Sequence, residues 1–151
     1  MHVTLESANQ PAVIQLIAEL DAYQDMLYPP ESRHSLDLTS LCQPNVLFAV
    51  VRDTGGQAIG CGAVVLGMSY GELKRMYVHP SSRGRGVAKA ILVLLESEAG
   101  QRACSTIMLE TGPSSSDALA FYETSGYRRR ALFGGYADDP LSVFMEKHIA
   151  G

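Results

Sequence analysis

The sequence lacks several features that mark other classes of protein. Its three cysteines, Cys42, Cys61 and Cys104, form no C-x-x-C pair and have no nearby histidine partner, so neither a disulfide framework nor a metal site is expected. Cys61 sits in an apolar run and is expected to be a buried structural thiol. The apolar runs are too short to cross a bilayer, and the first residues lack a secretory signal, so we expect a cytoplasmic protein without membrane association.

Positive charge is also scarce. The chain carries 12 lysines and arginines against 16 aspartates and glutamates, a net charge of −4, which argues against a protein that holds nucleic acid by bulk charge. Its 46% apolar and 19% charged residues are values typical of a globular protein. A length of 151 residues suits one compact unit, so we expect a single domain over residues 1–151.

Hydrophobic periodicity and turn residues predict strands interleaved with helices. Asn9 is expected to cap the first helix, with Pro11 in its first turn. The expected strands cover 2–6, 46–51, 58–66, 72–78, 106–110, 127–132 and 142–147, and the expected helices cover 11–27, 84–100 and 117–124. This order indicates an α/β (α+β) domain with a mixed sheet flanked by helices.

The segment Arg83-Gly84-Arg85-Gly86-Val87-Ala88 closes a predicted strand and opens a predicted helix. Glycines allow close approach of the backbone, and a helix N-terminus directs free N–H groups at an anion, so this loop is suited to a pyrophosphate. The Walker A pattern is absent, and the dinucleotide pattern G-x-G-x-x-G fails because Lys89 occupies its last position. An ordinary basic turn remains the alternative.

Two motifs together resemble the GCN5-related N-acetyltransferase (GNAT) superfamily. Its acetyl-CoA loop has the pattern Gln/Arg-x-x-Gly-x-Gly/Ala, which Arg83, Gly86 and Ala88 match. Downstream, Ala118 and Tyr122 fit the helix motif Asn-x-x-Ala-x-x-x-Tyr, although Ser115 replaces its asparagine. The resemblance covers roughly 71–147 and extends to a bacterial subgroup of small-molecule acetyltransferases. It implies the GNAT fold, a mostly antiparallel sheet of six to seven strands.

The resemblance also implies a cofactor site for acetyl-CoA. The end of the strand at 72–78 is expected to pair with the pantetheine arm, the loop amides to hold the pyrophosphate, and Lys89 to reach the outer phosphate. The implied cofactor-binding residues are Met76, Tyr77, Val78, Arg83, Gly84, Arg85, Gly86, Val87, Ala88, Lys89, Ser115 and Tyr122.

Direct acetyl transfer needs an unprotonated amine and a proton for the departing thiolate. The resemblance implies Tyr122 as the general acid and the Val78 amide as donor to the thioester oxygen. Glu72 lies eleven residues before Arg83, where some family members carry a catalytic glutamate, and is the candidate base. The alternatives are that Tyr122 only packs on the sheet and that Glu72 only pairs with Lys74 or Arg75.

The acceptor carries no signature in the sequence. We expect its pocket to involve Tyr28, His34 and the loop at 133–139, and the subgroup resemblance favours a primary amine of a small molecule or amino acid. A protein or peptide acceptor and a non-catalytic acyl-CoA-binding sensor remain alternatives. The run 128–130 of three arginines is expected to be a solvated strand edge, with attraction of an acidic acceptor as the other option. A homodimer is one arrangement open to the chain.

Overall fold

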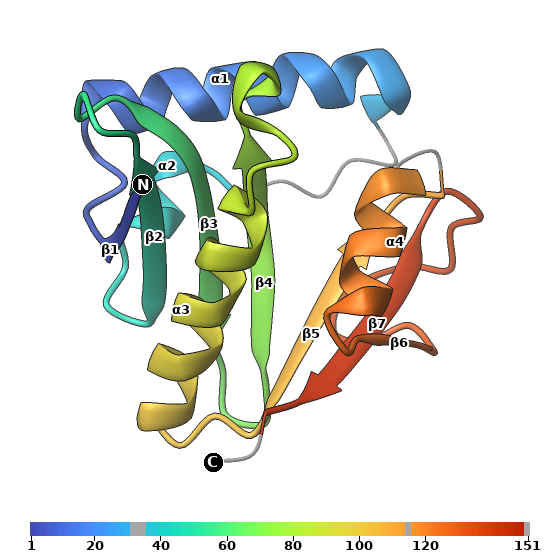
Figure 1. The fold of residues 1–151 in the computed structure, drawn as a ribbon. Coiled ribbons are helices and arrows are strands. Elements are labelled where there is room, and N and C mark those ends of the chain that lie inside the picture. Colours follow the sequence, from blue (N-terminus) through green and yellow to red (C-terminus); the bar gives the residue numbers. More distant parts are fainter. Residues whose placement is uncertain (31–35, 114–115, 150–151) are drawn as a thin grey trace.

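A computed structural model describes residues 1–30, 36–113 and 116–149. Seven strands form one sheet in the order β1-β2-β3-β4-β5-β7-β6, with helices α3 and α4 in front of it in Figure 1. The elements are β1 (His2–Leu5), α1 (Pro11–Leu27), α2 (Leu38–Leu41), β2 (Val46–Arg52), β3 (Ala58–Leu66), β4 (Gly71–Val78), the 3₁₀ turn η2 (Pro80–Ser82), α3 (Val87–Gln101), β5 (Thr106–Thr111), α4 (Ser116–Thr124), β6 (Arg128–Arg130) and β7 (Val143–His148). The predicted mixed, mostly antiparallel sheet flanked by helices is confirmed.

Among the strands of the described residues, only β4 and β5 pair in parallel, and their pairing is short. Gly71–Leu73 pairs with Ile107–Leu109, after which the two strands separate. Figure 1 shows them close at one end and diverging toward the other. The backbone of β4 from residue 74 onward therefore has no β5 neighbour, and a free strand edge is left inside the sheet.

Two hydrophobic clusters cover the two faces of the sheet. On one face, Ile91 and Leu95 of α3 pack against Leu73 and Leu109. On the other face, residues of α1 and α2 pack against strands β2, β3 and β4: the buried members are Ala8, Val13, Leu16, Leu20, Leu41, Phe48, Val50, Ala58, Cys61, Ala63 and Tyr77. Strand β4 thus contributes Leu73 to the α3 side but Tyr77 to the α1 side.

A bulge at Arg75 explains this change of side. Arg75 has a φ of 58°, in the left-handed region, and the pairing of β3 with β4 shifts its register here. Two residues separated by four positions would share a face in a regular strand, and the extra residue reverses that alternation. Glu72 and Lys74 consequently lie on the α1 side, whereas Met76 and Val78 face α3.

The Arg75 side chain ties the bulge to α1. Its Nη2 donates to Asp21 Oδ1 at 2.7 Å, and its side chain is only 3% exposed. Within the described residues its Nε and Nη1 atoms are buried without a hydrogen-bond partner. A strained, partly unsatisfied residue persists only where the surrounding structure enforces it, and here it sits where β4 leaves β5.

Three local expectations are corrected. Gln10, not Asn9, occupies the N-cap of α1, and no side chain caps that helix. Helix α3 begins at Val87 rather than at residue 84, because the left-handed Gly86 (φ 78°) is its N-cap. The short helix α2 was not predicted, since only four residues form it. Each correction concerns an end or a single turn, where periodicity carries little information.

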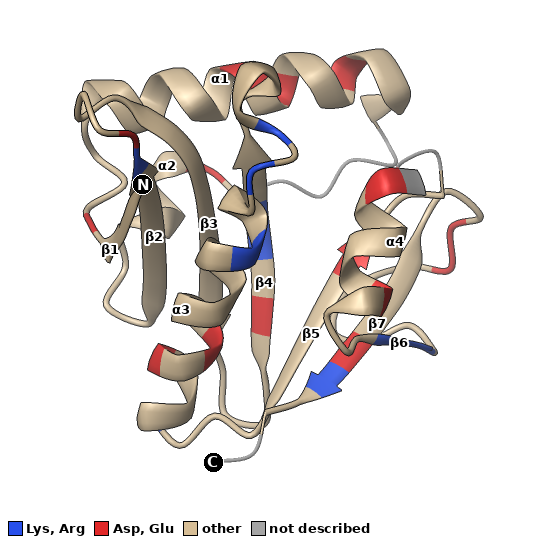
Figure 2. Ribbon diagram, in the orientation of Figure 1, with Lys and Arg blue, Asp and Glu red and all other residues tan. Residues whose placement is uncertain are grey.

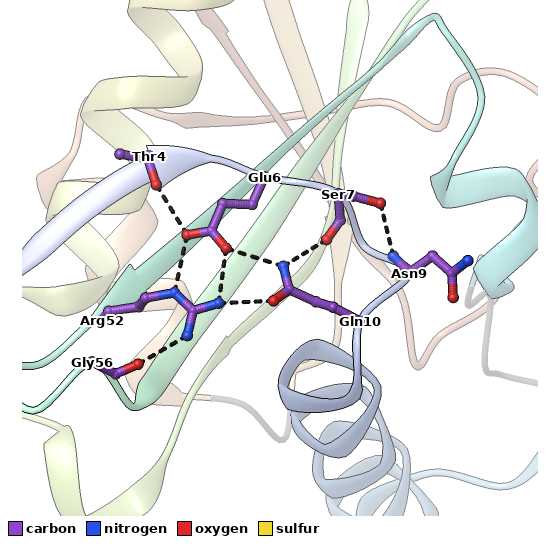
Figure 3. Close-up of polar contacts among 7 residues, drawn as sticks. All are labelled: Thr4, Glu6, Ser7, Asn9, Gln10, Arg52 and Gly56. Carbon is purple, nitrogen blue, oxygen red and sulfur yellow. Dashed lines mark hydrogen bonds and ion pairs between the residues drawn. The ribbon is translucent and has the colours of Figure 1, made fainter.

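A polar network joins β1, the start of α1 and the hairpin of β2 and β3 (Figure 3). Arg52 donates through Nη2 to Glu6 Oε1 at 2.8 Å and through Nε to Glu6 Oε2 at 3.1 Å. Thr4 and Gln10 also donate to the Glu6 carboxylate. The Arg52 hydrogen bonds, more than any other contact, lower the pKa of Glu6 to about 2.

This network predicts a pH-dependent contribution to stability. A carboxylate with a folded pKa below its unfolded value of 4.5 stabilises the fold above that value and loses the contribution as the pH falls toward 2. We expect Glu6→Gln to lower the free energy of unfolding at pH 7 by about 1–2 kcal/mol, after allowing for solvent screening of a partly exposed pair. Urea unfolding at pH 7 and near pH 2 measures it, and the difference from wild type should shrink at the lower pH.

The matched control is Glu98→Gln. Glu98 pairs with Arg102 at 3.0 Å on the surface of α3, an i,i+4 pair with little expected effect on stability. An equal loss for Glu6→Gln at both pH values would contradict the electrostatic origin of the contribution.

Candidate active site

A cavity of about 280 Å³ lies beside the free edge of β4. Its floor is the end of β4, and α4 and the α1 residues Leu20 and Tyr23 form its walls. The lining residues are Leu20, Tyr23, Met76, Tyr77, Val78, Arg83, Ala88, Asp117, Ala118, Phe121 and Tyr122. Predicted residues from three separate segments thus meet in one cavity.

The backbone of Val78 faces the opening. Tyr77 lies opposite Cys61 of β3, and the His79 amide donates to the Ile59 carbonyl at 2.9 Å. Successive residues of a strand point their backbone groups to opposite sides, so the Val78 amide and carbonyl are directed away from β3. The Arg83 guanidinium confirms this direction, since its Nε donates to the Val78 carbonyl at 3.2 Å.

The glycine loop adopts the backbone that an anion site needs. Gly84 and Gly86 have φ angles of 77° and 78°, which strain any residue with a side chain. Gly86 is followed at once by α3, so the free amides of the first helical turn point out of the loop. Figure 2 shows basic residues on this loop and at the start of α3, close to the end of β4. Arg83, Arg85 and Lys89 are exposed and supply that positive charge.

Tyr122 lies on the face of α4 toward the sheet and is only 7% exposed. Its ring packs on Phe121 at 5.3 Å and on Tyr127 at 5.8 Å between centroids. Burial raises the pKa of Tyr122 above its ordinary value, so the hydroxyl keeps its proton at neutral pH. Tyr122 packs on the sheet, as the alternative interpretation expects. It also lines the cavity, which packing alone does not explain.

Glu72 does not line the cavity. The bulge places it on the α1 face, where its Oε2 accepts a short hydrogen bond from the Tyr136 hydroxyl. Lys74 Nζ lies 3.4 Å from the same oxygen, so the predicted pairing with Lys74 is present, whereas Arg75 pairs with Asp21. Glu72 lies in the short stretch of β4 that pairs with β5, opposite Met108, on the α1 side of the sheet.

The segments expected around the acceptor also meet on this side. A β-carbon on Gly112, just after β5, would overlap the Tyr28 ring, so the end of α1 closes against the end of β5. Tyr136 brings the loop at 133–139 onto β4. The predicted residues His34 and Ser115 lie outside the described residues. Arg128 and Arg130 both pair with Glu146 of β7, which agrees with a solvated strand edge.

Some predicted positions differ from the cavity lining. Lys89 borders a shallow hollow with Val3 and Gly86 on another side of α3, and the structure does not place it in the main cavity. Tyr77 lines the cavity, but its hydroxyl is directed to α1, donating to Glu19 Oε1 at 3.2 Å. The lining residues that sequence reasoning missed are Leu20, Tyr23 and Asp117. In the sequence, Leu20 stood out only by its helical spacing. That spacing cannot distinguish a residue of the hydrophobic core from one that lines a cavity.

A family model described as the acetyltransferase (GNAT) family matches residues 16–127. The "IAA acetyltransferase" of Azospirillum brasilense is 44% identical over 149 residues, covering 97% of each chain. The chain belongs to the GNAT family. It is an N-acetyltransferase, and the fold of the family binds acetyl-CoA.

Three further similarities agree. The "uncharacterized N-acetyltransferase YsnE" of Bacillus subtilis is 34% identical, covering 99% of this chain and all of the other. A crystal structure from Klebsiella pneumoniae, of a candidate acyl-CoA N-acyltransferase, superimposes with a TM-score of 0.84 at 38% identity, covering 98% of this chain and 97% of the other. An aminoglycoside 6′-N-acetyltransferase crystallised with coenzyme A shares the fold at a TM-score of 0.75 and 20% identity, covering 100% and 98%.

The cysteines and the helices add two plain observations. Cys61 is fully buried, and burial raises the pKa of its thiol to about 12, as expected for a structural thiol rather than a nucleophile. No helix among the described residues has the length and apolar character needed to cross a membrane.

Proposed function

We propose that this N-acetyltransferase moves the acetyl group of acetyl-CoA directly to a primary amine of a small molecule. The observation that carries the proposal is the free edge of β4 beside the Tyr122 cavity. A pantetheine arm can pair with that edge as an added strand would, which brings its thioester to Val78 and Tyr122. The helix N-terminus and the basic loop then lie where the pyrophosphate would follow.

Each residue has a distinct chemical task in this proposal. The Val78 amide donates to the thioester oxygen as the carbonyl becomes tetrahedral and negatively charged. Glu72 takes a proton from the ammonium form of the acceptor, directly or through a water, so that a free amine attacks the carbonyl. The C–S bond then breaks, Tyr122 gives its proton to the departing sulfur, and the second proton that the nitrogen loses in becoming an amide restores the Tyr122 hydroxyl. Burial of the site favours this last step, because an unprotonated thiolate is poorly stabilised there.

A small acceptor is favoured by what surrounds the site. The end of α1 closes on Gly112, and the loop at 133–139 contacts Glu72, so both segments border the acceptor side. The name of the Azospirillum brasilense relative specifies IAA and no protein. These observations support a bounded pocket over an open groove for a peptide.

The test is release of CoA thiol from acetyl-CoA with a panel of acceptors. The panel contains spermidine, kanamycin, tryptamine, free amino acids, IAA and a peptide with an N-terminal alanine, and the acetylated product is identified by mass spectrometry. We expect at least one small amine to give saturable release with a kcat/KM about 100-fold or more above that of the peptide. Turnover with the peptide alone, or none with any amine while acetyl-CoA binds, would overturn the proposal.

A further inference from the structure

Tyr136 reaches the candidate base from a segment 64 residues away in the chain. Its hydroxyl donates to Glu72 Oε2 and at the same time accepts from Lys74 Nζ at 2.7 Å. A tyrosine hydroxyl has one proton to donate and can also accept, so a single chain of hydrogen bonds runs from the lysine through the tyrosine to the carboxylate. The two charged residues of this hydrogen-bond network, Lys74 and Glu72, come from β4, and Tyr136 between them comes from the loop.

The Tyr136 ring is held in place by aromatic contacts. Phe133 and Phe144 pack against it with centroids 5.3 and 5.5 Å away. Phe133 also packs on Tyr70, at the turn before β4, at 5.4 Å. These edge-on contacts anchor the loop at 133–139 to β4 and β7, so the position of the hydroxyl is set by a packed cluster. The Lys74 ammonium lies over the same ring, 5.2 Å from its centre.

The hydrogen bond and the ion pair of Glu72 both involve one of its two oxygens. Tyr136 and Lys74 both contact Oε2, and within the described residues no hydrogen bond or ion pair is made to Oε1. A carboxylate with one oxygen held by two donors loses rotational freedom, and its other oxygen points in a fixed direction. The Glu72 side chain is 17% exposed, so the carboxylate is not sealed off from solvent.

The geometry points to Tyr136 as a positioning residue: through its hydroxyl, the loop at 133–139 holds Glu72 with Oε1 free for the acceptor amine. The inference rests on the proposed function, because it assigns Glu72 the role of base. Tyr136 itself does not exchange a proton with the substrate. Burial and the hydrogen bond to Glu72 both raise the pKa of Tyr136, so it stays a proton donor to the carboxylate throughout the neutral range.

The polar groups around Glu72 come from several elements. On β4 there is Lys74, and on the loop there is Tyr136. Glu110 of β5 and Tyr70 of the turn before β4 interact electrostatically with Tyr136. Glu110 accepts from Ser142 at 2.9 Å. Loss of the Tyr136 donor removes one of the two contacts that hold Glu72 Oε2, so the carboxylate should lose its fixed orientation.

The test compares Tyr136→Phe with Glu72→Gln, using the best acceptor from the panel. Tyr136→Phe keeps the ring and its packing and removes only the hydroxyl. We expect kcat to fall roughly tenfold while the KM for the acceptor changes little, with the melting temperature and acetyl-CoA affinity unchanged. In the Glu72→Gln background the same substitution should have little further effect, because the contact it removes is already altered.

Tyr70→Phe is the matched control, since Tyr70 belongs to the same aromatic cluster and its hydroxyl makes no hydrogen bond to Glu72. Wild-type kcat and KM for Tyr136→Phe, beside a clear loss for Glu72→Gln, would overturn the positioning role and leave the proposed function standing. An unchanged rate for Glu72→Gln would overturn both roles of this pair while leaving acetyl transfer itself intact. Independent, additive losses for the two substitutions would also contradict the inference.

Discussion

Tyr122→Phe should abolish most turnover while acetyl-CoA still binds. The substitution keeps the ring that packs on Phe121 and Tyr127 and removes only the hydroxyl of this cavity-lining residue. Without it the departing thiolate has no proton donor of its own, and loss of a general acid typically costs 10²- to 10⁴-fold, so we expect kcat to fall about 10³-fold. Steady-state thiol release measures the rate, and calorimetry measures the dissociation constant of acetyl-CoA.

The control for this prediction is Tyr23→Phe, which removes the hydroxyl of another residue that lines the same cavity. It should change kcat by less than about threefold, because Tyr23 lies on α1 and has no role in proton transfer. A Tyr122→Phe enzyme with near wild-type kcat would leave Tyr122 as a packing residue. An equal loss in both variants would point to the shape of the cavity instead of a proton donor.

Gly86→Val should weaken acetyl-CoA binding by about 100-fold. The backbone of Gly86 is left-handed at a φ of 78°, and a β-branched residue there must either bear the strain or change the loop. Nothing lies within 4 Å of the position of the added β-carbon, so the expected loss comes from the backbone and not from a steric clash. Because Gly86 starts α3, a changed conformation would turn the amides of the first helical turn away from the pyrophosphate.

Gly100→Ala is the comparison for Gly86→Val. Gly100 lies in α3 with open space around it, so alanine should leave cofactor binding unchanged and stabilise the helix by roughly 0.5–1 kcal/mol. Calorimetric titration of both variants with coenzyme A, together with their melting temperatures, separates loss of the site from loss of the fold. Wild-type affinity in Gly86→Val would show that the loop does not bind the pyrophosphate through its backbone.

The order and type of the main elements could be predicted, because their hydrophobic periods are clear and glycines or prolines bound them. The sequence also indicated several residues that the structure brings together in one cavity, since they lie in two short segments, at 76–89 and near Tyr122. Their role in binding acetyl-CoA stays a prediction. The bulge at Arg75 could not, because its conformation depends on burial and on Asp21, far away in the sequence. That bulge decides which face Glu72 occupies.

Tyr136 shows a second limit of the sequence. A loop of glycines and aspartates marks a turn but gives no partner for a tyrosine within it. Its contact with Glu72 depends on the aromatic packing of Phe133 and Phe144, and therefore on how β7 lies in the sheet. Spacing along the chain predicts contacts within a motif, whereas contacts between segments 64 residues apart require the folded sheet.

Amide hydrogen exchange followed by NMR tests the acetyl-CoA site most directly. The account predicts that coenzyme A slows exchange at the free edge of β4, at the Met76 and Val78 amides, and in the glycine loop at 84–88. Exchange at amides that already pair with β3, such as that of His79, should change little. Saturating coenzyme A that left the Val78 amide and the glycine loop unprotected, or that protected only the hollow beside Val3 and Lys89, would contradict the account.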